Sequence, residues 1–83
     1  MTARPAPPPL RVCGSETLPG TADAAAKRQA AQGLLATARG MGFQGPAEWQ
    51  EQMTDDGGRR TITCTVWHDT ATMDAFYERK QND

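Results

Sequence analysis

The stretch RRTITCTVWHD, residues 59–69, alternates regularly between apolar and polar side chains. Ile62, Cys64 and Val66 share one parity, and successive side chains of a β-strand point to opposite faces of a sheet. The alternation therefore predicts a strand with one apolar face, which another part of the protein must cover. The other face of this strand would carry Thr61, Thr63, Thr65 and Trp67.

A second alternating run predicts the neighbouring strand. Residues 47–54, AEWQEQMT, alternate in the same way, with Glu51 as the one charged residue on the apolar side. Between the two runs stands DDGG, residues 55–58, where aspartates bond their own backbone and glycines accept a positive φ. The pattern predicts a β-hairpin from about residue 47 to residue 67.

Residues 21–42, TADAAAKRQAAQGLLATARGMG, are rich in alanine and predict the first helix. Thr21 is a suitable N-cap, Asp23 suits the first turn, and Gly40 or Gly42 ends the helix. One side of this helix is an apolar stripe, which needs larger side chains of a sheet opposite it because each alanine buries little area. The stripe consists of Ala24, Ala31, Leu34, Leu35, Ala38 and Met41.

Two shorter segments complete the expected fold. Residues 10–13 predict a short strand before the breakers that follow, and residues 70–81, TATMDAFYERKQ, predict a last helix capped by Asp69 or Thr70. We therefore expect an α+β fold, a small single domain of β-α-β-β-α order. Its helices would pack on one face of a three-stranded, mainly antiparallel sheet.

The length and the prolines set the domain boundaries. A chain of 83 residues allows one domain with a small core. Residues 1–9 hold four of the six prolines, and this composition predicts a disordered, extended leader. We expect the domain to span residues 10–80 and residues 81–83 to form a tail.

Charge and hydropathy limit the classes of partner. The formal net charge is −1, which argues against the broad positive field of a general nucleic-acid or anionic-membrane binder. The sequence has no long apolar run for a membrane span, and its start, MTARPAPPPL, lacks the apolar core of a secretory signal. We expect no membrane association and a cytoplasmic location, with Cys13 and Cys64 as reduced thiols.

No residue pattern in the sequence specifies a chemical reaction. In a straight strand Cys64 and His68 would lie about 13 Å apart, at about 3.3 Å per residue, which is too far to share a metal ion. Asp55 and Asp56 stand in a turn and lack a cleft for acid–base chemistry. The glycines match no phosphate-binding motif. The sequence therefore predicts no catalytic residue, no metal site and no cofactor, and the protein is expected not to be an enzyme.

Trp67 has two interpretations. Either the last helix folds back over it, or the second face is itself the core, and Trp67 is an ordinary packing residue in both cases. Alternatively, an exposed tryptophan anchors a binding face for a second copy or for another protein, because tryptophan is enriched among interface anchors. That binding face would consist of Trp67, Thr61, Thr63 and Thr65.

The order of strand, Pro-Gly, helix and hairpin, followed by VWHD and TMDAF, is similar to that of the dimeric α+β barrel proteins of the antibiotic-biosynthesis monooxygenase type. The likeness covers residues 10–77. It implies an open sheet face that pairs with its twin, and a tryptophan at the end of the strand before the second helix. The sequence departs from this pattern after Lys80, where no fourth strand is expected, and it carries no recognisable catalytic set.

The first functional hypothesis is a small non-catalytic protein-interaction module that occupies a partner's surface. In size it resembles the small inhibitors and regulators of phages and mobile elements, anti-CRISPR proteins among them. A second hypothesis is a nucleic-acid-binding module with a basic rim. A third is a small dimeric enzyme or ligand-binding protein, to which His68, Tyr77 and Cys13 would contribute. The basic rim would consist of Lys27, Arg28, Arg39, Arg59 and Arg60.

Overall fold

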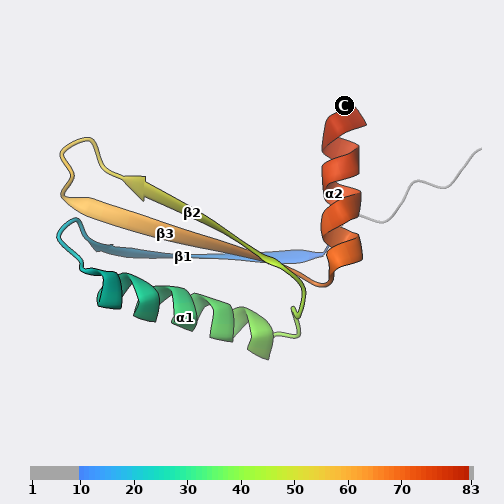
Figure 1. Cartoon of the computed structure of the whole chain (residues 1–83), viewed down its shortest axis with the longest axis horizontal. Coiled ribbons are helices and arrows are strands. Elements are labelled where there is room, and N and C mark those ends of the chain that lie inside the picture. Colours follow the sequence, from blue (N-terminus) through green and yellow to red (C-terminus); the bar gives the residue numbers. More distant parts are fainter. Residues whose placement is uncertain (1–9, 83) are drawn as a thin grey trace, which may run out of the picture.

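The computed structural model describes residues 10–82 and contains three strands and two helices in the predicted order (Figure 1). The predicted leader, residues 1–9, lies outside the described residues. The elements are β1 (Arg11–Pro19), α1 (Ala24–Gly40), β2 (Ala47–Met53), β3 (Arg59–Trp67) and α2 (Thr70–Asn82). The predicted α+β class and the β-α-β-β-α order are confirmed.

The central strand of the sheet is β3, which pairs antiparallel with β1 on one side and with β2 on the other. β1 is longer than the predicted strand over residues 10–13, because β3 offers it a backbone partner over its whole length. The side chains add to this pairing. The Ser15 and Thr63 hydroxyls are 2.9 Å apart, and those of Thr17 and Thr61 are 3.2 Å apart.

The predicted turn at residues 55–58 joins β2 to β3. The Asp56 carboxylate accepts hydrogen bonds from the Thr54 hydroxyl and from the Gly58 N–H, and these bonds lower the pKa of Asp56. Gly57 has a φ of 69°, a conformation that glycine adopts without steric cost. The turn therefore forms for the reasons that its sequence suggests.

Local hydrogen bonds set both ends of α1. The N-cap is Asp23, whose side chain accepts a bond from the Ala26 N–H, so the prediction of Thr21 as N-cap is wrong. At the other end the backbone N–H of Phe43 bonds to the carbonyl of Ala38, and Gly42 has a φ of 96°. This is a Schellman ending, in which a left-handed glycine allows the chain to leave the helix.

The core lies between α1 and the sheet. Cys64 and Val66 are 2% and 0% exposed and contact Ala38, and Leu34 and Leu35 pack around this group. The apolar face predicted for residues 59–69 is therefore buried under α1. The predicted stripe of α1 is wrong at its two ends, because Ala24 is exposed and Met41 is 59% exposed.

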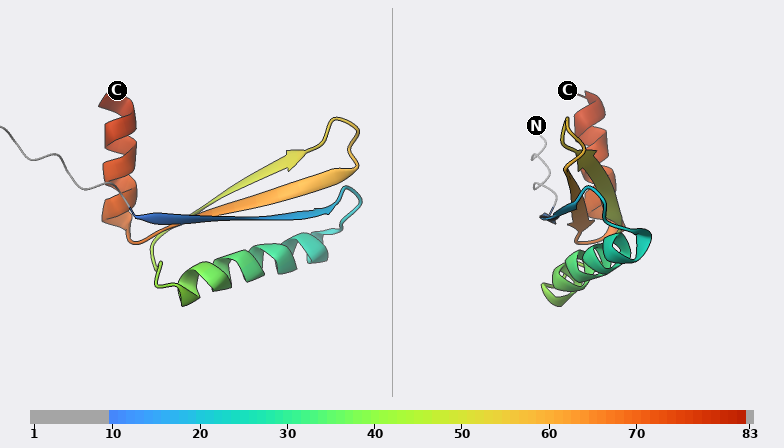
Figure 2. Two further views of the ribbon diagram at one scale, coloured as in Figure 1. Left: turned by 180° about the vertical axis from the view of Figure 1, so that it is seen from behind. Right: turned by 90° about the vertical axis from the view of Figure 1, so that its left-hand side faces the viewer.

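The second helix lies elsewhere than expected. α1 covers one face of the sheet, whereas α2 stands at the end of the sheet and rises on the other side (Figures 1 and 2). Asp69 starts α2 as its cap, because its carboxylate accepts a bond from the Thr72 N–H and the Thr72 hydroxyl bonds back to the Asp69 carbonyl. The helix thus begins two residues after β3, beside the last side chain of that strand.

Neither of the two helices in the described part of the chain has the length and apolar character needed to cross a membrane.

Candidate functional site

The sheet face opposite α1 is polar and uncovered over most of its length. Antiparallel pairing places Cys13, Ser15 and Thr17 of β1 beside the threonines of β3. Their hydroxyls bond to one another across the strands, which suits a face in contact with water. Thr61, Thr63 and Thr65 therefore lie on the open face, on the side that their parity indicates.

Trp67 belongs to the same face but is covered by α2. Its side chain is 1% exposed, and its ring lies 5.0 Å from that of Phe76 and 6.2 Å from that of Tyr77. The first interpretation of Trp67, burial under the last helix, is therefore the one that the structure shows. An exposed tryptophan at the end of the threonine face is not present.

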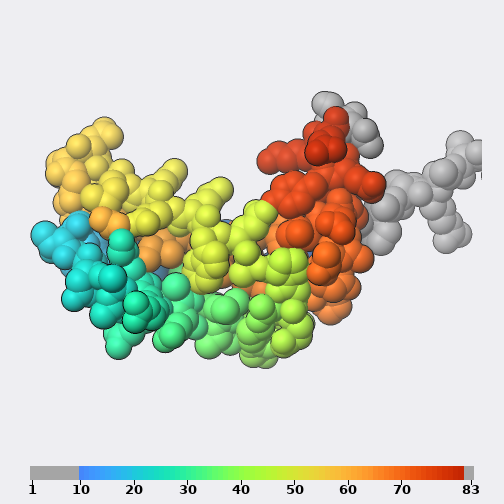
Figure 3. Space-filling view, in the orientation of Figure 1, coloured from blue at the N-terminus to red at the C-terminus, as the bar shows by residue number. Residues whose placement is uncertain are grey.

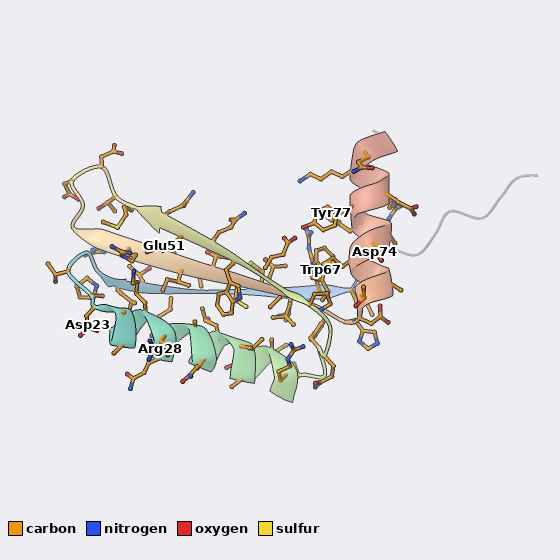
Figure 4. All side chains as sticks on the ribbon, in the orientation of Figure 1. Asp23, Arg28, Glu51, Trp67, Asp74 and Tyr77 are labelled. Carbon is orange, nitrogen blue, oxygen red and sulfur yellow. The ribbon has the colours of Figure 1, made fainter. Side chains whose placement is uncertain are left out.

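A cleft of about 230 Å³ lies in the angle between the open face and α2. Figure 3 shows the molecule hollowed between β2 and α2, and Figure 4 shows Tyr77 projecting from α2 on the side of Trp67. The sheet and the helix together form this site. Its lining residues are Arg11 and Cys13 of β1, Glu48 and Gln50 of β2, Thr65 and Trp67 of β3, and Phe76, Tyr77 and Lys80 of α2.

Two cations border the cleft and rest on its aromatic rings. The Arg11 guanidinium carbon lies 4.4 Å from the centre of the Phe76 ring and 5.3 Å from that of Trp67. The Lys80 ammonium lies 5.6 Å from the Phe76 ring centre. Within residues 10–82 neither cation forms an ion pair with a carboxylate. The rings therefore stabilise the cations by cation–π attraction without neutralising them.

The indole N–H of Trp67 is buried and has no hydrogen-bond partner among the described residues. A buried donor without an acceptor costs roughly 1–3 kcal/mol relative to one that is bonded. Burial of the Trp67 ring therefore gains free energy from its apolar surface but leaves its N–H without a hydrogen bond.

The five basic residues of the predicted rim do not form a single patch of unpaired cations. Arg39 donates to the backbone carbonyls of Phe43 and Gly45, at 2.9 and 2.6 Å. The Lys27 and Arg60 side chains both pair with Glu51. Of the proposed rim, Arg28 and Arg59 are the two exposed residues without such a contact in the described part of the chain.

The three residues suggested for an enzyme are also separated. Cys13 and Tyr77 line the cleft, whereas His68 is exposed and its ring lies 6.4 Å from that of Phe43, edge to face. No group of three or more His, Cys, Asp or Glu side chains within residues 10–82 is placed to hold a metal ion. The three side chains thus form no single catalytic arrangement.

Both thiols are free, and they lie on opposite faces of the sheet. Cys13 is exposed on the open face, and Cys64 is buried under α1. Burial raises the pKa of the Cys64 thiol, because the thiolate would lose its hydration.

Most of the cleft was not predicted from the sequence. The sequence identifies Phe76 and Tyr77 as neighbours on one helix, but Arg11 and Lys80 carry no local signal of a shared site. Both cations lie near the Phe76 ring because the start of β1 lies beside the end of β3, where α2 begins. Long-range pairing of this kind leaves no trace in a short stretch of sequence.

Comparison with known protein families, with curated proteins and with solved structures gave no match to this chain, so its function has to be inferred from the cleft itself.

Proposed function

We propose that the protein is a small non-catalytic interaction module, a regulator or inhibitor that acts by occupying the surface of a partner protein. The cleft between the open face and α2 is the contact that we assign to this role. The observation that carries the proposal is the pair of cations, Arg11 and Lys80, that border an aromatic cleft without an ion-pair partner among the described residues. A carboxylate supplies the counter-charge for both cations.

The size and composition of the cleft favour a protein side chain as its occupant. Its volume of about 230 Å³ is smaller than that of most small-molecule pockets, which hold roughly 300–1,000 Å³. Tryptophan, tyrosine and arginine are the residue types that carry most binding energy at protein interfaces. We therefore expect an aspartate or glutamate of the partner to enter the cleft, with neighbouring residues lying along the open face.

The charge of the cleft is less suited to a nucleic acid. Arg11 and Lys80 are the two cations among the residues that line it. Double-stranded DNA carries one charge per about 1.7 Å of its axis, so it requires a longer row of cations. A single carboxylate between two cations fits the arrangement better than a phosphate backbone does.

The proposal can be tested by nuclear magnetic resonance of the indole N–H. In a Trp49→Phe background, Trp67 gives the one indole signal of the described domain. A short glutamate-rich peptide is expected to shift this signal, and a matched glutamine-rich peptide is expected to leave it in place. Lys80→Gln should weaken binding by roughly two- to fivefold, as expected for loss of one exposed ion pair. Lys27→Gln, on the other side of the sheet, is the matched control.

Two results would contradict the proposal. An equal shift with the glutamine peptide would show that the cleft does not select a carboxylate. A larger shift with single-stranded DNA, weakening steeply as salt is added, would instead support the nucleic-acid hypothesis.

A further inference from the structure

Among residues 10–82, no strand pairs with the outer edge of β1. Two backbone bonds show which residues of β1 are hydrogen-bonded to β3. They run from the Gly20 N–H to the Gly58 carbonyl and from the His68 N–H to the Leu10 carbonyl. In an antiparallel ladder the bonding direction alternates, so the even-numbered residues of β1 bond to β3. The N–H and C=O groups that face away from the sheet belong to Arg11, Cys13, Ser15 and Thr17.

This edge lacks two of the features that usually block strand addition, a bulge and a proline in mid-strand. The β1–β3 register runs without interruption, and the proline of β1 is its last residue, Pro19. Native proteins commonly protect an edge with a bulge, a proline or a charge in mid-strand. Each edge strand has one glutamate in mid-strand, Glu16 in β1 and Glu51 in β2. β1 is the longer of the two, with nine residues against seven, and we take it as the edge that is open to another strand.

An apolar groove of about 240 Å³ runs beside this edge, between β1 and α1. Val12 and Gly14 line its sheet side, and Leu34 and Met41 line its helix side. Gly14 lets α1 come close, because a Cβ at this position would lie 3.3 Å from Leu34 Cδ2. A strand added to β1 would cover this groove, including Met41, which is 59% exposed.

The unpaired groups of β1 are complementary to themselves. Residues 11, 13, 15 and 17 are symmetric about Gly14, so a two-fold axis at Gly14 pairs Arg11 with Thr17 of a second copy, and Cys13 with Ser15 of that copy. All of their outward N–H and C=O groups are then bonded. An axis at residue 15 would place Arg11 opposite Pro19 of the second copy, and an axis at residue 16 would place Cys13 there. Pro19 has no N–H to donate in either case. An axis at residue 13 would leave Thr17 unpaired within the strand.

The helices fit the same arrangement. Adjacent strands lie about 4.8 Å apart and α1 lies over β1 and β3, so the two α1 axes would be about 10 Å apart, within helix-packing distance. Thr37 lines the groove, and Gly33 and Gly40 follow it on the same side of α1 at spacings of four and three residues. These small residues allow a close approach, and nothing lies within 4 Å of a Cβ placed on Gly33.

We propose that two copies of the chain join through β1 about a two-fold axis at Gly14 and form one six-stranded antiparallel sheet. Both α1 helices lie on one face of it, and Leu10, which is 58% exposed, lies opposite Leu18 of the second copy. The two open faces become one continuous surface with an α2 cleft at each end. This assembly does not rest on the proposed function of the cleft.

The first measurement is the mass in solution, by sedimentation velocity, of the full chain over roughly a hundredfold range of concentration. A species of twice the chain mass of 9.0 kDa is expected. Ser15→Pro removes one outward N–H without removing a backbone bond to β3, and it should weaken the dimer by about tenfold or more. Ser15→Ala is the control, because it removes the hydroxyl and keeps the N–H.

A second variant tests the helix contact without harming the monomer. Gly33→Glu places a long charged side chain in open space on α1 and replaces a poor helix former, so the fold should be kept. The same substitution should dissociate the dimer, because the second α1 would lie against it. Gln32→Glu adds the same charge on an exposed position that faces away from the groove, and this variant should remain a dimer.

Cross-linking reports the register. Ser15→Cys places a thiol opposite Cys13 of the second copy in a hydrogen-bonded pair, where the Cα atoms lie about 5.5 Å apart, a distance that a disulfide spans. Oxidised glutathione should therefore convert this variant into a covalent dimer. Thr17→Cys should cross-link poorly, since Thr17 lies opposite Arg11 of the second copy.

Several outcomes would overturn the proposal. A chain that stays monomeric at every concentration has no such interface. A dimer that survives both Ser15→Pro and Gly33→Glu but is lost on Thr63→Arg uses the open face instead. Strong cross-linking of Thr17→Cys, or of the unaltered chain through Cys13, would place the two-fold axis at residue 15 or residue 13 and exclude the register about Gly14.

Discussion

The two helices are attached to the sheet in different ways. α1 lies along one face and packs on two strands, with Cys64 and Val66 buried beneath it. α2 stands at one end of the other face and is held mainly by the contacts of Phe76 and Tyr77 with Trp67. One helix thus shares a continuous core with the sheet, whereas the other is held at the end of the sheet by Trp67 and Arg11.

This difference assigns the stable core to α1 and the sheet, and the candidate binding cleft to α2. A core shared along a whole helix makes α1 and the sheet one cooperative unit. A helix held by few contacts at one end of the sheet is expected to open at lower free energy than the rest, as segments that contact ligands commonly do. The cleft therefore belongs to the less strongly held part of the molecule, and substitutions on the two faces should have different effects.

The largest effect is expected from Trp67→Ala. Loss of a buried tryptophan costs about 3–5 kcal/mol, more than an isolated helix of 13 residues supplies, so α2 should unfold while the rest stays folded. Hydrogen exchange checks this, because α2 amides should lose protection while the Cys64 amide keeps it. Trp49→Ala, at a tryptophan that is 44% exposed, is the control. Equal loss of protection at Cys64 would show that both helices unfold together.

A smaller but global effect is expected from Val66→Ala under α1. The side chain is fully buried, so its truncation should lower the free energy of unfolding by about 2–3 kcal/mol in urea titrations. Thr63→Ala on the open face removes one hydroxyl contact with Ser15 and should cost about 1 kcal/mol or less. Similar costs for the two variants would mean that the open face is covered in solution.

The two helix caps allow a matched comparison. Asp23→Ala and Asp69→Ala each remove a side-chain bond to the first turn of a helix, worth about 1 kcal/mol. The loss at Asp23 should appear in the free energy of global unfolding. The loss at Asp69 should appear only as faster exchange of α2 amides. A lower global stability for Asp69→Ala would contradict the separate behaviour of α2.

The smallest effect concerns pH. The pKa of Cys64 is raised in the folded protein, so the unfolded chain ionises first as the pH rises through about 8.5. The unfolded state then binds fewer protons than the folded state, and stability should fall with pH in this range. Cys64→Val should remove that part of the slope, and Cys13→Val should keep it. Stability curves from urea titrations at several pH values would measure both slopes.

Local patterns account for most of the fold. The alternation of residues 59–69, the DDGG turn and the alanine-rich helix were each predicted from residues close together in sequence. Errors occurred where distant partners intervene. β1 extends past Gly14 to Pro19 because β3 supplies bonds across it, and Met41 is exposed as the C-cap residue that follows α1.

The element order, the antiparallel hairpin and the face of β3 that lies under α1 follow from the sequence, because each depends on periodicity and turn chemistry within a short stretch. Contacts between distant residues were needed to place α2 on the other face, over Trp67, and to bring Arg11 to Phe76. The physical reason is that a one-residue step along β3, from Val66 to Trp67, reverses the side on which the last helix must pack.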